Sequence, residues 1–167
     1  SLGDARLAAL VDDLAGIPHV ERLRVHSRLP VVVPARITVD LLDWLGGSRL
    51  RPVLVVHANH PREIDAEVAA ALRRVAAAGI PLLNQSVLLR GVNDDADTLC
   101  ALSETLFAAG ALPYYLHQLD RVQGAAHFAV AADRAQALMV GLRTRLPGYL
   151  VPRLVREDAG AASKTAL

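Results

Sequence analysis

The chain contains 167 residues, about the length of one domain, of which 53% are hydrophobic and 4% aromatic. This composition is typical of a globular protein and excludes a disordered one. The formal net charge of +1 gives no electrostatic basis for binding nucleic acid or an anionic membrane. No apolar run approaches the roughly 20 residues that a membrane-spanning helix needs.

Helical and extended patterns alternate along the chain, with short connections between them. In chain order we predict a helix at 7–14, a strand at 19–26, a helix at 38–45, a strand at 52–56, a helix at 61–78, a strand at 82–87, a helix at 94–109, a strand at 112–117, a helix at 131–146 and a strand at 149–155. This order predicts right-handed βαβ units and a parallel sheet. We count about four to five such units, so the predicted fold is α/β, a partial parallel (β/α) barrel. Pro152 favours an edge position for the last strand.

The stretch PLLNQSVLLRGVND, residues 81–94, organises the rest of the chain. It begins as an apolar strand, turns polar at Asn84, Gln85 and Ser86, and ends in a turn that precedes the next helix. In α/β folds ligands contact the carboxyl ends of parallel strands. The polar residues therefore either contact a ligand or only satisfy the backbone of neighbouring loops.

Polar residues gather at the carboxyl ends of four predicted strands. The groups are His26, Ser27 and Arg28; His57, Asn59 and His60; Asn84 and Gln85; and His117, Gln118 and Asp120. Parallel strands end at the same edge of a sheet, so four such groups predict one ligand site there.

The sequence gives less support to a zinc site, a serine hydrolase or a phosphate-binding loop. His57 and His60, with His26 and His117, could form a zinc site, but there is no CxxC pair. Ser86 does not lie in a G-x-S-x-G elbow, and no phosphate-binding glycine loop is present.

Lys164 is the only lysine, whereas arginine occurs throughout. Lysine can lose its proton and form a Schiff base, which arginine cannot do. Lys164 therefore either carries such chemistry or is a chance survivor in the small-residue tail 158–167, which we predict to be a loop after the domain 1–157.

Five stretches together resemble the lysine 2,3-aminomutase family of radical S-adenosylmethionine enzymes. They are HSRLPVVVPARIT, HANHPREID, LLNQSVLLRGVND, PYYLHQLDRVQGAAHF, and PGYLVPRLVRE with the later SKT. The resemblance covers about residue 17 to the end and implies part of a radical S-adenosylmethionine barrel. It also implies an isomerase that converts L-α-lysine to β-lysine by a 1,2 shift of the amino group. LDRVQGAAHF and the chain end resemble most the branch that makes (R)-β-lysine for elongation factor P.

The resemblance implies residue roles position by position. The family joins pyridoxal 5'-phosphate to a lysine before a threonine, which is here Lys164. Its two acids that bind the substrate ammonium correspond to Asp120 and Glu157. The second acid is usually aspartate in the family, so Glu157 is a departure and Asp158 is a competing candidate.

The other cofactors concern different residues. His57 and Gln85 match family positions near S-adenosylmethionine. The family holds a [4Fe–4S] cluster with CxxxCxxC, but Cys100 is the only cysteine here and lies in a predicted helix. We therefore expect no metal ligands in this chain, cluster ligands in a missing N-terminal part, and no radical formation by this C-terminal part alone.

The resemblance further implies a cytoplasmic enzyme with L-lysine as substrate, a link to elongation factor P and its lysyl ligase, and homo-oligomerisation as an option. An unpaired strand edge would make the fragment prone to aggregate or dependent on a partner. The alternatives are a non-catalytic remnant or subunit that binds pyridoxal phosphate or lysine, a catabolic lysine 2,3-aminomutase, and an unrelated α/β hydrolase or isomerase that uses the histidines.

Overall fold

A single sheet organises the computed structural model, which describes residues 3–120, 123–158 and 160–167. Within these residues the sheet has six strands in the order β1-β2-β3-β4-β5-β6. The strands are Arg22–Ser27 (β1), Arg51–Val56 (β2), Leu82–Leu88 (β3), Leu112–Gln118 (β4), Arg153–Arg156 (β5) and Thr165–Ala166 (β6). Strands β1 to β5 are parallel, and β6 is antiparallel to β5. Strands that follow one another in the chain also pair in the sheet, which confirms the predicted α/β fold with a partial parallel barrel.

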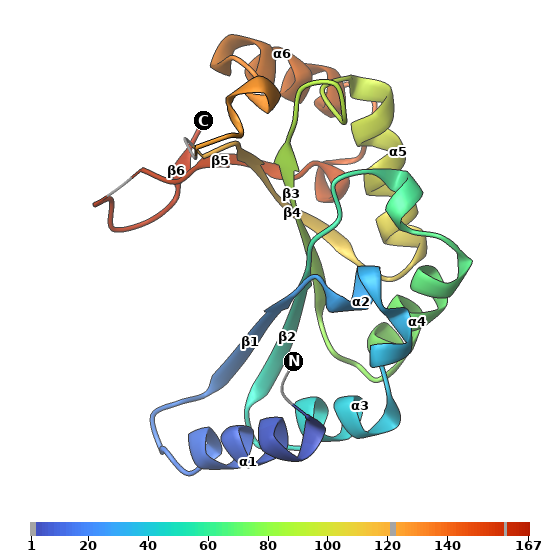
Figure 1. Ribbon diagram of the computed structural model, residues 1–167, viewed down its shortest axis with the longest axis vertical. Coiled ribbons are helices and arrows are strands. Elements are labelled where there is room, and N and C mark those ends of the chain that lie inside the picture. The colour runs from blue at the N-terminus through green and yellow to red at the C-terminus, as the bar shows by residue number, and fades with distance from the viewer. Residues whose placement is uncertain (1–2, 121–122, 159) are drawn as a thin grey trace.

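The helices connect the strands and gather on one side of them (Figure 1). They are α1 (Asp4–Ala15), α2 (Leu29–Val32), α3 (Val39–Gly46), α4 (Ala66–Ala77), α5 (Ala96–Ala108) and α6 (Ala132–Arg143), with the short 3₁₀ turns η1 (Pro34–Arg36), η2 (Pro61–Glu63), η3 (Ala126–Phe128) and η4 (Gly148–Leu150). Side chains of Thr38, Asp65 and Asp95 accept hydrogen bonds from backbone N–H groups at the starts of α3, α4 and α5. Among the described helices, none combines the length and apolarity needed to cross a membrane.

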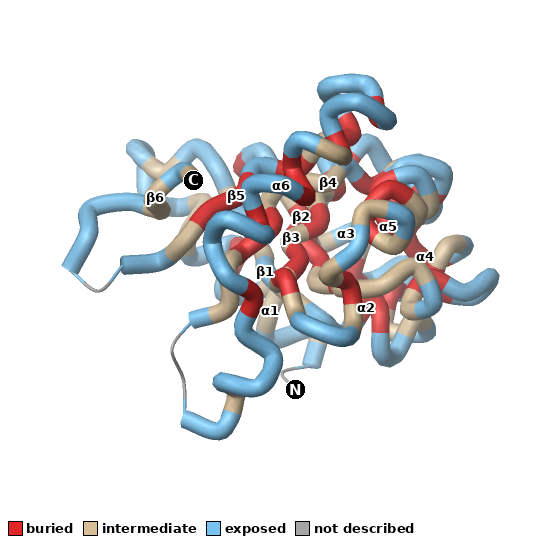
Figure 2. Tube along the Cα trace, turned by 90° about the horizontal axis from the view of Figure 1, so that it is seen from above, coloured by how far each residue is buried: buried red, intermediate tan, exposed pale blue. Residues whose placement is uncertain are grey.

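The hydrophobic core lies between the sheet and these helices, where Figure 2 shows the buried residues. Leu54 and Leu82 belong to a cluster with α3 and α4, whereas Leu88, Leu116 and Leu154 belong to a second cluster with α5 and α6. Successive side chains of a strand point to opposite faces of the sheet. The side chains that alternate with these leucines along each strand therefore point to the other face of the sheet, which we call the open face.

The structure corrects three predicted elements. The predicted helix 61–78 is divided into η2 and α4, because His60 and Glu63 form a capping box around η2 and Asp65 caps a new helix. The predicted strand 149–155 contains η4, and β5 begins only after Pro152, which has no N–H to donate. Strand β5 lies between β4 and β6 and not at the sheet edge, so the tail predicted to be a loop adds a strand.

Candidate functional site

The open face brings together side chains from four successive strands. Gln85 pairs in register with Tyr115 across β3 and β4, and His117 pairs with Val87, so these residues share a face. The rings of His26 and His57, on β1 and after β2, lie 5.9 Å apart in an edge contact. Side chains from all four predicted polar groups thus lie on one face, but Asn84 and Gln85 lie in the middle of β3 and do not end it as predicted.

Three histidines of this face have a pKa below the ordinary value of 6.5. Burial is the main cause for His26, His57 and His117. Arg24 adds to the effect at His26, Arg28 at His57 and Lys164 at His117. These imidazoles are therefore neutral near pH 7, and each can accept a hydrogen bond through one nitrogen.

Asn84 and Ser86 point the other way and hold a loop in place. Asn84 accepts a hydrogen bond from the Ala58 N–H at 2.8 Å and donates to the Ala58 carbonyl at 3.1 Å. The Ser86 hydroxyl donates to the same carbonyl at 2.8 Å. Of the three polar residues in the organising stretch, Asn84 and Ser86 satisfy backbone, and Gln85 alone lies on the open face.

A cavity of about 300 Å³ lies at the carboxyl ends of these strands. Its lining comprises Arg28, His57, Asn59, Gln85, Ser86, Val87, His117, Gln118, Leu119, Asp120 and Glu157. Asp120 follows β4 and Glu157 follows β5, and both also line an adjacent cavity of about 910 Å³. The structure thus brings His57, Gln85, Asp120 and Glu157, four of the five predicted site residues, to one cavity.

Lys164, in the tail, contacts one of the two acids that line this cavity. Its Nζ contacts the Glu157 carboxylate and lies 5.6 Å from the centroid of the Tyr115 ring. The Lys164 ammonium holds the pKa of Glu157 below its ordinary value of 4.5. The His117 ring meets Tyr115 edge-on at 5.7 Å, and His117 Nδ1 lies 3.9 Å from Glu157 Oε1.

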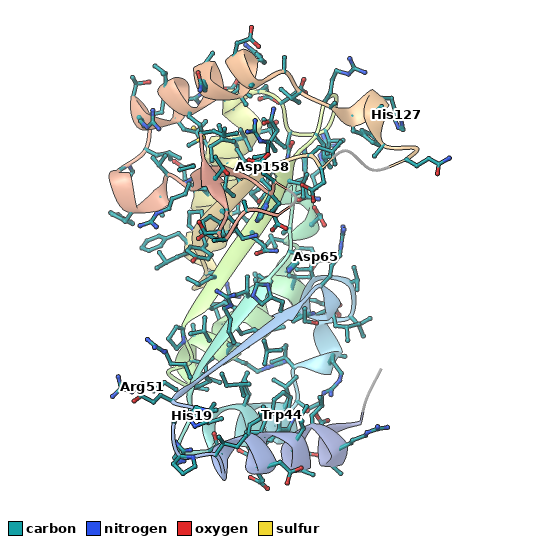
Figure 3. The ribbon with its side chains drawn as sticks, turned by 90° about the vertical axis from the view of Figure 1, so that its left-hand side faces the viewer. His19, Trp44, Arg51, Asp65, His127 and Asp158 are labelled. Carbon is teal, nitrogen blue, oxygen red and sulfur yellow. The ribbon has the colours of Figure 1, made fainter. Side chains whose placement is uncertain are left out.

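Asp158, the competing acid, has different partners. It accepts hydrogen bonds from Arg156 at 2.8 Å and from the Thr165 hydroxyl at 2.8 Å. The Arg156 guanidinium, followed by Thr165, lowers the pKa of this carboxyl. Figure 3 labels Asp158 at the end of the molecule that carries the tail. Its contacts lock the tail against β5, whereas Glu157 contacts Lys164.

Of the four histidines that could have formed a zinc site, His60 is engaged in local structure. His60 Nδ1 accepts a hydrogen bond from the Arg62 N–H and caps η2. Among residues 3–120, 123–158 and 160–167, no group of three histidine, cysteine or acidic side chains is placed to hold a metal ion. Cys100 is buried in α5 within the second core cluster, and burial raises the pKa of its thiol. It lies away from the open face.

Tyr115 is a site residue that the sequence reasoning missed. Its side chain lies under Lys164 and beside His117. The signal available was its register, because Tyr115 lies two residues before His117 on the same strand and so points to the same face.

Comparison with curated proteins finds close relatives over nearly the whole chain. The chain is 53% identical over 164 residues to L-lysine 2,3-aminomutase of Escherichia coli (strain K12), covering 98% of this chain and 48% of the relative. It is 52% identical over 162 residues to that of Haemophilus influenzae and 41% identical over 165 residues to that of Clostridium subterminale, covering 48% and 39% of these relatives. The chain spans about half the length of the curated relatives it matches. No protein-family model matches the chain.

Two solved structures share the fold at low sequence identity. A radical SAM methyltransferase from Sphaerobacter thermophilus superimposes with a TM-score of 0.56 at 21% identity, covering 73% of this chain and 39% of that one. A domain of pyruvate-formate lyase-activating enzyme from Bacteroides vulgatus gives a TM-score of 0.60 at 16% identity, covering 95% and 96% of the two chains. At these identities the likeness concerns the fold alone.

Proposed function

We propose, from the premise that this chain is homologous to the L-lysine 2,3-aminomutases, that it is the C-terminal part of an isomerase that moves the amino group of L-lysine from C2 to C3. The tail 158–167 would carry the cofactor lysine and the barrel segment 1–157 the substrate and nucleoside contacts.

The observation that carries this proposal is that two carboxylates and an amine share one site. Asp120 and Glu157 line the same cavity, and Glu157 contacts Lys164. Two neighbouring carboxylates repel each other, so a cationic group between them is stabilised by both. The terminal ammonium of lysine is a ligand of this charge and size, and the two acids would compensate for its lost hydration.

The residues around Lys164 fit pyridoxal 5'-phosphate. Lys164 lines a cavity of about 640 Å³, together with Tyr115, Arg143 and Arg153. The lysine would attach the cofactor, the tyrosine ring offers an aromatic wall, and either guanidinium can pair with a phosphate. When bound, the cofactor supplies the π system that carries the amino group during the shift. The protein residues bind, orient and shield the reacting groups from water.

The described residues offer contacts for S-adenosylmethionine but no ligands for an iron–sulfur cluster. His57 Nε2 is buried without a hydrogen-bond partner among the described residues, and with Gln85 it offers polar contacts for S-adenosylmethionine. A [4Fe–4S] cluster needs several thiolates, whereas Cys100 is the only cysteine in the chain and is buried in the second core cluster. The cluster does not fit these residues, so its ligands would come from elsewhere.

The finer assignments are part of the same proposal. The enzyme would be cytoplasmic and belong to the branch that supplies β-lysine for elongation factor P. It would be linked functionally to the lysyl ligase of that factor and could self-associate. The stretch LDRVQGAAHF supports this branch over a catabolic aminomutase, because it is part of the sequence resemblance to that branch. Glu157 departs from the aspartate that is usual in the family and adds little to this distinction.

The test is to trap the cofactor on the chain. The chain is mixed with pyridoxal phosphate and reduced with borohydride, and the modified peptide is identified by mass. Because Lys164 is the only lysine, only the N-terminal amine competes. We expect label on Lys164 that is lost when excess L-lysine is added before reduction. No label above that of a denatured control would overturn the proposal.

A second candidate function is binding of cofactor and substrate without radical formation. The observation that favours it is the single, core-buried Cys100. Reconstitution with iron and sulfide, followed by a search for reductive cleavage of S-adenosylmethionine, separates the candidates. We expect no cleavage of S-adenosylmethionine by this chain alone. Cleavage that appears only when a protein with the CxxxCxxC cluster motif is added would favour the isomerase.

A further inference from the structure

His117 lies inside the candidate site with an unused polar atom. The residue is only 8% exposed and is the last but one in β4, between Val87 on β3 and Val155 on β5. Its Nε2 is buried and has no hydrogen-bond partner among the residues that the structure describes. A buried polar atom without a partner costs free energy, and in native proteins it often marks the place of a ligand.

The surroundings of His117 set which nitrogen carries the proton. Nδ1 faces the Glu157 carboxylate, 3.9 Å from Oε1. A carboxylate this close favours an N–H on the nearer ring nitrogen, so we assign the proton of the neutral ring to Nδ1. Burial and the neighbouring Lys164 ammonium keep the pKa of His117 below 6.5, against the opposing charges of Glu157 and Asp120. Nε2 is then an acceptor with a free lone pair.

The orientation of the ring is fixed by packing. Tyr115 meets it edge-on at 5.7 Å, with the planes of the two rings 79° apart. The neighbours in register, Val87 and Val155, are apolar and offer no alternative partner for Nε2. The ring is therefore held as part of the cavity wall that also includes Asp120 and Glu157.

We propose that His117 is a substrate-binding residue whose Nε2 accepts a hydrogen bond from the terminal ammonium of the amino-acid substrate. An ammonium has three N–H donors, and Asp120 and Glu157 provide one carboxylate each. His117 provides the third acceptor without a third negative charge, which would add repulsion to the site. This inference rests on the proposed function, because it concerns the same substrate in the same cavity.

The test measures how strongly the chain distinguishes L-lysine from L-norleucine, which has the same carbon chain and no terminal ammonium. The chain is loaded with pyridoxal phosphate, each amino acid is titrated, and the concentration that halves the borohydride label on Lys164 is recorded. Both amino acids displace the lysine through the same α-amino group. The ratio of the two concentrations therefore reports recognition of the ammonium alone.

Three variants separate the two ring nitrogens. His117→Asn keeps a donor near Glu157 and removes the distal acceptor, His117→Gln keeps a polar atom at the distal position, and His117→Phe keeps neither. A hydrogen bond to a charged group predicts that Phe and Asn lower the preference for lysine about tenfold, while Gln retains most of it. His127→Phe, in η3, is the matched control and keeps the wild-type ratio.

Each outcome has one meaning. An unchanged lysine preference in His117→Phe overturns the inference and leaves the proposed function standing. Retention by Asn together with loss by Gln also overturns it, because the Nδ1 side would then be responsible. Absence of label on Lys164 in the unaltered chain overturns the proposed function and, with it, the role given to His117. Equal losses of affinity for lysine and norleucine would show that His117 has only a structural role and would contradict the inference.

Discussion

Lys164 and Glu157 form an ion pair in which the Lys164 ammonium contacts the carboxylate proposed to bind the substrate ammonium. The Lys164 side chain and the side chain of the substrate lysine are both primary ammonium groups on flexible alkyl chains, so they compete for this one carboxylate. Attachment of the cofactor to Lys164 would remove the lysine's contact and leave Glu157 free. The geometry therefore predicts that the cofactor binds before the substrate.

The first prediction concerns which of two adjacent acids recognises lysine. Glu157→Gln removes the charge next to Lys164, so the preference for lysine over norleucine in the trapping assay falls about tenfold or more. Asp158→Asn is the matched control, since Asp158 pairs with Arg156 and Thr165 and holds the tail. A larger loss of preference in Asp158→Asn than in Glu157→Gln would assign the role to the other acid.

The strand–helix order was predictable because each element carries its own local signal. The apolar run that precedes His57 marks the end of β2, and Thr38 marks the start of α3. The convergence of His57 and Asp120 followed from one rule, that parallel strands end at one edge, whereas Gln85 reaches the cavity from within β3. Their proposed roles depended on the family resemblance and not on periodicity.

Features that depend on contacts between distant residues could not be predicted. Asn84 and Gln85 are adjacent amides. Only the alternation of side chains along β3 decides that Asn84 bonds to Ala58 while Gln85 lies on the open face. Strand β6 consists of two residues whose pairing with β5 leaves no local pattern. The same holds for Tyr115, whose position beneath Lys164 requires the tail to fold back.

The second prediction concerns the stability of the loop that carries His57. Asn84→Leu removes two hydrogen bonds to Ala58 and leaves the buried Ala58 N–H without its partner. An unsatisfied buried donor predicts a loss of about 2–3 kcal/mol in the free energy of unfolding, measured in urea. Gln85→Leu, one residue on, should change it by less than about 0.5 kcal/mol. Similar losses in both variants would show that the Ala58 contacts contribute little.

The third prediction concerns pH. Because burial lowers the pKa of His26, His57 and His117 below 6.5, the unfolded chain binds more protons than the folded chain below about pH 6.5. The contribution of these groups to stability is therefore constant above that pH and decreases as the pH falls through the folded-state values. Urea midpoints at pH 7.5, 6.5 and 5.5 measure this. His117→Gln should reduce the decrease, and an identical pH dependence in that variant would exclude His117 as a source.

The last prediction concerns how α1 is held to the barrel, at the end of the molecule where Figure 3 labels Trp44. Asp4 accepts two hydrogen bonds from Arg36, at 2.8 and 3.0 Å, and one from the Trp44 indole N–H at 2.8 Å. Trp44 is the only tryptophan, so its fluorescence reports the docking of α1. Asp4→Ala should shift the emission to longer wavelength, because Trp44 loses its partner and gains solvent. Asp4→Asn keeps an acceptor for the indole and should shift it less.

The matched control for this prediction is Asp12→Ala, an exposed acid on the same helix, which should leave the emission unchanged. Acid provides an independent check on the same contact. Arg36, followed by Trp44, lowers the pKa of Asp4 below 3.8, so the contact persists at pH 4 and is lost only as the pH falls through the lowered value. A shift in emission that begins well above pH 4 in the unaltered chain would mean that other groups hold α1 in place.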